Sequence, residues 1–166
     1  MATPLPLGQR LHLGTQLTLP AAQGRVSFPI LLPAQLGQPD AVYVGTPPPS
    51  GEVTLVYRPR AALPVTTETG VGMLLSEFQA SLDETWFYKG IGPDTHVVPV
   101  TVRGQPGYWL AGSPHFFRYG GADGQYADEP LRLAGNTLIW THGTLTLRIE
   151  SALSEQEALT IANSLR

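Results

Sequence analysis

The residues that could do chemistry are few and widely spaced along this sequence. The chain has no cysteine, which excludes disulfides, thiol catalysis and cysteine-based zinc sites. Its four histidines form none of the short spacings, such as H-x-H or H-E-x-x-H, by which a zinc site is recognised. These histidines are His12, His96, His115 and His142. The carboxylates in "DGQYADE" lack the closer alternate spacing of a calcium loop, so a solvated turn is the favoured interpretation there.

Motifs for nucleophilic catalysis and for phosphate binding are also missing. The sequence has no G-x-S-x-G elbow, and "TGVGML" lacks the third glycine of a dinucleotide-binding loop. The single lysine, Lys89, follows Tyr88 rather than a glycine, so there is no phosphate-binding loop of the Walker type. We therefore predict a non-enzymatic protein with no catalytic residues, no metal and no cofactor. A hydrolase without a recognisable motif is the least favoured alternative.

Each histidine also has a structural interpretation. His142 is predicted at the first position of a two-residue turn, where histidine tolerates a positive φ better than most residues. His115 begins an aromatic strand with no nucleophile or carboxylate placed near it in sequence, and we interpret it as a half-exposed strand residue. His96 lies beside Asp94 and is interpreted as a turn residue.

Aromatic residues cluster more than charged residues do, in "TWFYKG" and "GYWLAGSPHFFRY". The favoured interpretation is a core, because aromatic side chains prefer strands and bury large areas. The alternative is a concave sheet face that binds an apolar or peptide ligand. Successive strand residues point to opposite faces, so Tyr108 and Trp109 cannot both line it. The candidate ligand-binding residues are Trp86, Tyr88, Tyr108, Trp109, Phe117 and Tyr119.

Length and composition indicate one globular domain. The chain has 166 residues, of which 42% are apolar and only 14% charged, which argues against intrinsic disorder. The net charge of -3 and the absence of a basic stripe exclude nucleic-acid binding. No polybasic segment, signal peptide or membrane span is present, so we expect membrane attachment only through an anchor outside this chain.

Glycines and prolines separate short apolar runs, which is the rhythm of strands and turns. Strands are predicted at 41–45 and 52–58, within 71–80, in a hairpin around Gly104-Gln105, and in the aromatic run at 115–119. Three more are predicted at 130–134, 137–141 and 144–150, joined by the tight turns Gly135-Asn136 and His142-Gly143. Alternation in the last strand predicts one buried face and one wet face, the wet one carrying Thr146, Arg148 and Glu150.

Helices are predicted at 18–24, from Asp83 to about Gly90, and at the C-terminal end. The last begins at Ser154, which forms a capping box with Glu157, and an apolar stripe follows at i, i+3, i+4 and i+7. We expect an α+β fold, a predominantly antiparallel twisted sheet with a few helices and the C-terminal helix packed on one face. Residues 1–16 are predicted to be an N-terminal tail or linker, and residues 17–166 a single domain.

The C-terminal run "LRLAGNTLIWTHGTLTLRIESALSEQEALTIANSL" resembles a bacterial family of domains of unknown function. The matching residues are Trp140, Gly143, Leu147, Ser154, Glu157, Ile161, Ala162, Ser164 and Leu165. The segments "VSFPILLPAQLG", "VTLVYRPR" and "VTVRGQPGYWLAG" are also similar, so the resemblance covers most of the chain from about residue 17. Members are found as the extracytoplasmic C-terminal domain of anti-sigma-factor-like membrane proteins.

The resemblance implies an extracytoplasmic sensor or protein-interaction domain with an unidentified protein partner, and it implies no enzymatic activity. A cytoplasmic location stays open, because a chain without cysteine is compatible with either compartment. The alternative function is a binding module for an apolar ligand, lipid or peptide, on the aromatic sheet face.

Overall fold

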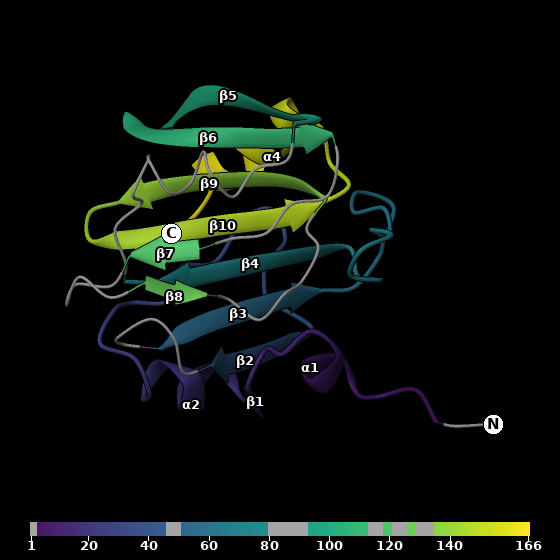
Figure 1. Cartoon of the computed structure of the whole chain (residues 1–166). Helices are drawn as coiled ribbons and strands as arrows, with labels where there is room; N and C mark the ends of the chain where they lie inside the picture. Colours follow the sequence, from purple (N-terminus) through teal and green to yellow (C-terminus); the bar gives the residue numbers. More distant parts are fainter. Residues whose placement is uncertain (1–2, 46–50, 80–92, 113–117, 121–125, 129–134) are drawn as a thin grey trace.

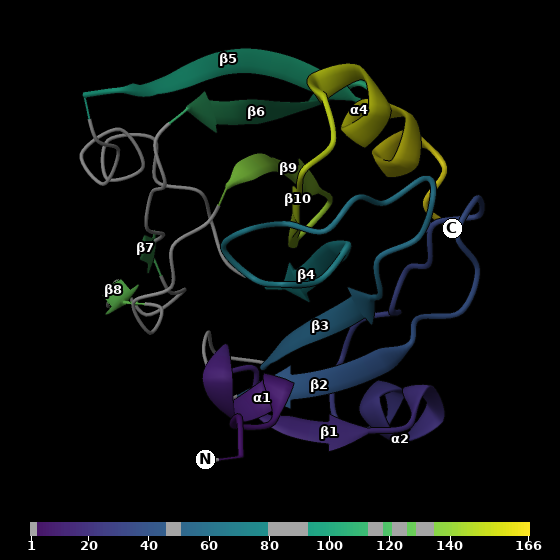
Figure 2. The same ribbon diagram turned by 90° about the vertical axis from the view of Figure 1, so that its right-hand side faces the viewer.

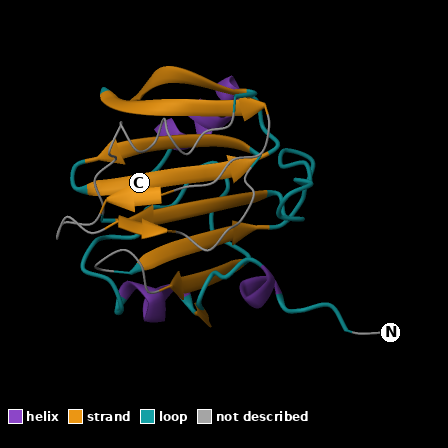
Figure 3. Cartoon of the chain, viewed as in Figure 1, coloured by secondary structure: helices purple, strands orange, loops and turns teal. Residues whose placement is uncertain are grey.

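The computed structural model describes residues 3–45, 51–79, 93–112, 118–120, 126–128 and 135–166. Strands dominate it (Figure 3). Eight of them form one sheet in the order β1-β2-β3-β4-β10-β9-β6-β5, and every neighbouring pair is antiparallel (Figure 1). The prediction of a predominantly antiparallel sheet is confirmed, and the fold is an α+β fold in which strands prevail.

The first half of the large sheet is built from consecutive strands. These are β1 (Thr15–Leu17), β2 (Ala41–Gly45), β3 (Glu52–Tyr57) and β4 (Met73–Phe78). Helix α1 (Leu7–Arg10) precedes them, and helix α2 (Leu19–Gln23) follows β1. The side chain of Thr18 caps α2 by accepting the N–H of Ala21, as the sequence predicts. Leu11 and Leu13 are buried, so part of the segment expected to be a tail packs against the sheet.

The second half returns from the far edge to the centre. Strand β5 (Thr95–Val102) is the outer edge, followed inwards by β6 (Gln105–Gly112), β9 (Asn136–His142) and β10 (Leu145–Ser151). Strand β10 then pairs with β4, which lies far from it in sequence. Two short strands, β7 (Arg118–Gly120) and β8 (Tyr126–Asp128), form a separate ribbon. The two halves of the sheet therefore meet at β4 and β10, and each of these strands has a neighbouring strand on both sides.

Both predicted turns that the structure describes are displaced by one residue. His142 pairs with Leu145, so the turn residues are Gly143 and Thr144, and His142 is the last residue of β9. The expectation of a positive φ at His142 is wrong, and Gly143 adopts it instead, with φ 59°. In the β5–β6 hairpin the turn residues are Arg103 and Gly104, with φ of 49° and 78°, the pattern of a type I′ turn.

One face of the large sheet carries the main hydrophobic core, and we call it the core face. Leu55, Leu75, Leu138 and Ile149 lie on it in adjacent strands, with Trp109 continuing the same row. Helix α4 (Glu155–Asn163) packs against this face through Ala158, Ile161 and Ala162. Figure 2 shows α4 on one side of the sheet and the β7–β8 ribbon on the other. The prediction of a C-terminal helix packed on one face is confirmed.

Backbone contacts also tie the C-terminal tail to a segment that crosses the core face. The N–H of Leu32 donates to the carbonyl of Arg166, and the N–H of Arg166 donates back to Leu32. The bridge between Pro33 and Leu165 lies beside this pair. Next to this pair in sequence, Asn163 at the end of α4 accepts the backbone N–H of Arg103 in the β5–β6 turn with its side chain. The C-terminal end of α4 and the tail that follows it are thus held by two separate segments.

The capping box of α4 forms as predicted. Ser154 Oγ accepts the N–H of Glu157, and the Glu157 carboxylate accepts both the backbone N–H and the hydroxyl of Ser154. Both hydrogen bonds to Ser154 lower the pKa of the Glu157 carboxyl. Because this pKa is lowered in the folded protein, the stabilisation is present above the ordinary carboxyl pKa and is lost as the pH falls through the folded value.

We expect Ser154→Ala to lower the free energy of unfolding by about 1 kcal/mol, because the first turn of α4 loses its cap. Urea denaturation at neutral pH, followed by circular dichroism, measures the change. Thr160→Ala on the exposed side of the same helix is the control, since alanine favours helix there and no cap is removed. An equal loss in both variants would contradict the capping role.

Candidate functional site

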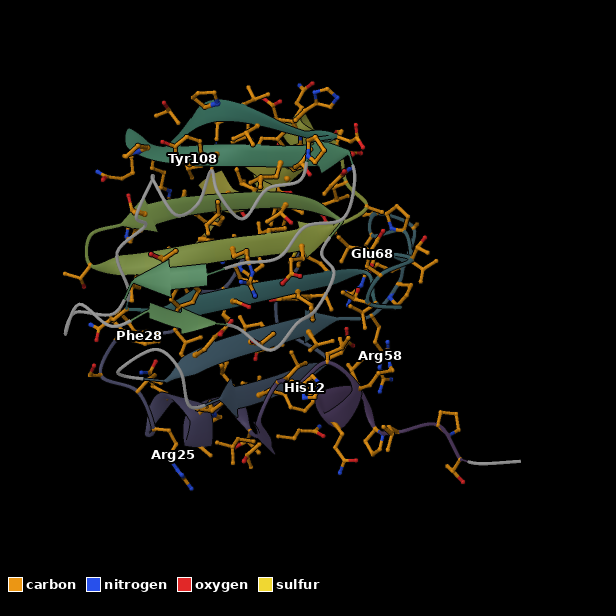
Figure 4. All side chains as sticks on the ribbon, in the orientation of Figure 1. His12, Arg25, Phe28, Arg58, Glu68 and Tyr108 are labelled. Atoms are coloured by element: carbon orange, nitrogen blue, oxygen red, sulfur yellow. The ribbon has the colours of Figure 1, made fainter. Side chains whose placement is uncertain are left out.

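The two described aromatic candidates lie on opposite faces of the large sheet. Trp109 is buried in the core cluster. Tyr108 is half-buried on the other face, beside Ile139 in the sheet register and in the position labelled in Figure 4. The parity argument is confirmed: these two residues do not line one surface. Trp86, Tyr88 and Phe117 lie outside the described residues. Tyr119 lies in β7, of which only the backbone is described.

The described histidines do not gather with other reactive groups. His12, His96 and His142 are exposed, and His12 adopts a positive φ of 54° after α1. Within the described ranges, no group of three or more histidine, aspartate or glutamate side chains could hold a metal ion. His115 and the carboxylates at 123 and 129 lie outside these ranges, and Asp128 is described only as the last residue of β8.

A cluster of buried charges occupies the face opposite the core face. Arg148 on β10 is completely buried, with a side-chain exposure of 0%. Its Nε donates to the Glu150 carboxylate at 3.1 Å, and an Nη nitrogen lies 3.5 Å from the Glu52 carboxylate on β3. We call Glu52, Arg148 and Glu150 the charged cluster. The sequence assigned Arg148 and Glu150 to a wet face, and this expectation is wrong.

Hydroxyl side chains extend the charged cluster across the sheet. Ser76 pairs with Arg148 in the register between β4 and β10, and Thr54 pairs with Ser76 between β3 and β4. The hydroxyls of Thr54 and Ser76 are 3.3 Å apart and both are buried. Thr146 and Thr137 are buried on the same face. The central strands are therefore buried on both faces, and on this face the polar side chains lie among apolar ones such as Leu74, Phe78 and Ile139.

The contacts within the charged cluster fix the positions of its side chains. A buried arginine that lies between two carboxylates fixes their positions relative to one another, because charge-assisted hydrogen bonds are directional. The Ser76 hydroxyl bonds to Thr54 rather than to a base. In the part of the chain that the structure describes, no histidine hydrogen-bonds to a serine or to a carboxylate.

A second buried carboxyl lies on the core face, at Glu77 of β4. It faces Val53 and Leu147 in the sheet register and has an exposure of 0%. The backbone N–H of Leu31 donates to its two oxygens, at 3.0 and 3.2 Å. Desolvation raises the pKa of Glu77 to about 8, although the hydrogen bond from Leu31 acts in the opposite direction. Glu77 is therefore a neutral acid at pH 7 that anchors the crossing segment to the sheet.

The carboxyl of Glu77 has the pKa of a general acid, but its surroundings differ from those of an active site. A catalytic acid must reach a reacting atom within hydrogen-bond distance. Glu77 instead contacts aliphatic neighbours and one backbone N–H. Sequence reasoning missed it, although its alternation with Met73 and Leu75 along β4 was a usable signal that it shares their face.

The outer surface near β3 carries solvated charges. Arg60 forms an ion pair with Asp40 at 2.6 Å, both side chains being about a third exposed (39% and 31%), and its guanidinium lies 5.9 Å from the Tyr57 ring centroid. Arg25 and Arg58 extend outward from the surface (Figure 4). Burial raises the pKa of the Tyr57 phenol, whose hydroxyl donates to the carbonyl of Gly37. These contacts hold the loops around Gly37, Asp40 and Arg60 against β3.

Comparisons with known proteins found no match, either to a protein-family model, to a curated protein or to a solved structure. Within the described residues, no helix is long and apolar enough to cross a membrane. The class of protein defined by the fold is a strand-dominated α+β domain with a buried polar cluster on one sheet face.

Proposed function

We propose that this chain is a non-enzymatic sensor or protein-interaction domain that lies outside the cytoplasm in an anti-sigma-factor-like protein. The proposal rests on one observation: the residues that carry the family resemblance have structural roles in this fold. Trp140, Leu147 and Leu165 are buried in the core, and Ser154 with Glu157 forms the cap of α4. A pattern of this kind preserves a scaffold rather than a set of reactive groups, as expected of a domain that works by binding.

The charged cluster supports the same proposal. A domain that recognises a protein must hold its surface in one arrangement, and a buried polar set with internal hydrogen bonds and ion pairs favours a single packing of the central strands. The hydroxyls of Ser76 and Thr54 are engaged with each other on that face. The proposed partner is a protein, and attachment to the membrane would come through a segment other than this domain.

The location is tested by fusing alkaline phosphatase after Arg166 in the intact gene product, because this reporter is active only outside the bacterial cytoplasm. Phosphatase activity is the expected result. A matched fusion to green fluorescent protein at the same residue should then be dark. A fluorescent fusion with silent phosphatase would overturn the extracytoplasmic assignment and favour a cytoplasmic domain.

The interaction role is tested separately, by cross-linking the intact protein in its host and identifying what is attached to residues 17–166. A single protein partner that is lost when the domain is deleted supports the proposal. Native mass spectrometry of the purified domain examines the alternative, since a co-purified lipid or peptide would favour the apolar-ligand module instead.

A further inference from the structure

The large sheet has two edges, and only one of them is long. Strand β1 is a three-residue edge that leads directly into α2. Strand β5 is an eight-residue edge, and no strand lies beyond it in the part of the chain that the structure describes. An edge of this length presents a row of backbone N–H and C=O groups that can pair with a second strand.

The usual charged protection of an edge is missing from β5. The strand reads THVVPVTV and contains no lysine, arginine, aspartate or glutamate. Val98 is 41% exposed on the core face, beside the buried Trp109 of β6. Two copies of this strand would therefore meet without charge repulsion and with an apolar side chain at the centre of the contact.

The turn between β5 and β6 determines which backbone groups face outward. Its two residues, Arg103 and Gly104, join strands whose flanking pair is Val102 with Gln105. In a two-residue hairpin this flanking pair is hydrogen-bonded, and the pairs then alternate along the ladder. Pro99 is paired with Tyr108, three residues from Val102, so it occupies a pair without mutual hydrogen bonds. The backbone nitrogen of Pro99 therefore points away from β6, toward the open edge.

The same alternation accounts for the second proline of the hairpin. Pro106 is paired with Thr101, again in a position without mutual hydrogen bonds, so its nitrogen points toward β9. The ladder between β6 and β9 begins at Gly107, one residue later, as expected when Pro106 has no N–H to donate. Pro106 therefore limits an internal ladder, whereas Pro99 interrupts the exposed edge.

We propose that Pro99 keeps this domain from pairing through β5 with β5 of a second copy of the same chain. In a twofold antiparallel arrangement centred on Val98, Pro99 of each copy faces Val97 of the other. The proline ring then occupies the place where an N–H would donate to the facing carbonyl. This inference concerns self-association and does not depend on the proposed function.

The test measures sedimentation velocity of the full chain over a wide range of protein concentration. Wild type is expected to stay monomeric. Pro99→Val supplies one new donor per copy, two per dimer, and should associate at least about tenfold more tightly. Pro106→Val is the matched control, because it makes the same chemical change on a strand away from the edge, and it should behave as wild type.

A second variant identifies the surface. Val98→Lys added to Pro99→Val places two like charges opposite each other at the twofold axis and should restore the monomer. Pro99→Thr gives the same new donor and should also associate, so the test does not depend on one variant folding well. Circular dichroism checks that each variant keeps its strands. A monomeric Pro99→Val with native strands would overturn the proposal, and so would a wild-type dimer that Val98→Lys dissociates.

Discussion

Replacing Glu77 by glutamine is expected to stabilise the folded domain by about 5 kcal/mol at pH 8.5 and to change its stability little near pH 4. The folded pKa of Glu77 is about 8, against an ordinary value of 4.5. Between these values the folded protein keeps a proton that the unfolded chain releases. Each pKa unit of difference corresponds to about 1.4 kcal/mol.

The sign follows from which state binds the proton. Because the folded pKa is raised, the wild-type domain is most stable, as far as Glu77 is concerned, below the unfolded pKa. It loses that stability steadily as the pH rises through the folded value, and above pH 8 the loss is complete. Glutamine has nearly the shape of the neutral acid and can accept the N–H of Leu31, but it does not ionise.

The measurement is the free energy of unfolding in urea for wild type and Glu77→Gln at a series of pH values from 4 to 9. The difference between the two should grow with pH. Glu157→Gln is the control with the opposite sign, because the pKa of Glu157 is lowered and that variant should lose stability relative to wild type above the carboxyl pKa. A flat difference for Glu77→Gln would show that its carboxyl is ionised in the fold.

The features that the sequence predicted well are those with local causes. The capping box of α4 depends on Ser154 and Glu157, three residues apart, and both bonds form. The cap of α2 by Thr18 has the same local origin. The apolar alternation at Leu145, Leu147 and Ile149 correctly predicted a strand with these residues in the core. Each of these signals lies within one turn of helix or a few strand residues.

The errors come from contacts between segments that are distant in sequence. Alternation in β10 predicts a solvent-exposed face only if no other part of the chain covers that face. The pairing of Arg148 with Ser76 places Arg148 at the centre of the sheet. Figures 1 and 2 show the β7–β8 ribbon on this side of the sheet, an arrangement that no local pattern in β10 contains. The charged cluster was missed for the same reason. Glu52 and Arg148 are distant in sequence, and the strand order β3-β4-β10 brings them together.

Turn positions were missed by one residue for a different reason. A glycine in a two-residue hairpin can occupy either turn position, so "HGT" is compatible with His142-Gly143 and with Gly143-Thr144. Both turns place Leu145 and Leu147 on the face of Leu138 and Trp140, so the apolar alternation does not separate them. In the structure Leu145 pairs with His142, which assigns the turn to Gly143 and Thr144.

Replacing Arg148 by methionine is expected to lower the free energy of unfolding by about 3–5 kcal/mol at neutral pH. The variant leaves the carboxylates of Glu150 and Glu52 without the guanidinium that bonds them, and an uncompensated charge in a buried site is costly. Methionine fills much of the space of the arginine stem, so the loss reports the charge rather than a cavity. Glu150 is almost as deeply buried as Arg148 and should contribute most of the penalty.

Two comparisons isolate this cause. Arg60→Met makes the same substitution in the exposed ion pair with Asp40 and should cost at most about 1 kcal/mol, because solvent screens that pair. Arg148→Met combined with Glu150→Leu removes both partners of the closest bond and should recover part of the loss. The cost of Arg148→Met should also shrink as the pH falls toward 4, where the orphaned carboxylates take up protons. Urea denaturation of wild type and the three variants gives the change in the free energy of unfolding for each variant. If Arg148→Met costs no more than Arg60→Met, the charged cluster is not a buried electrostatic unit.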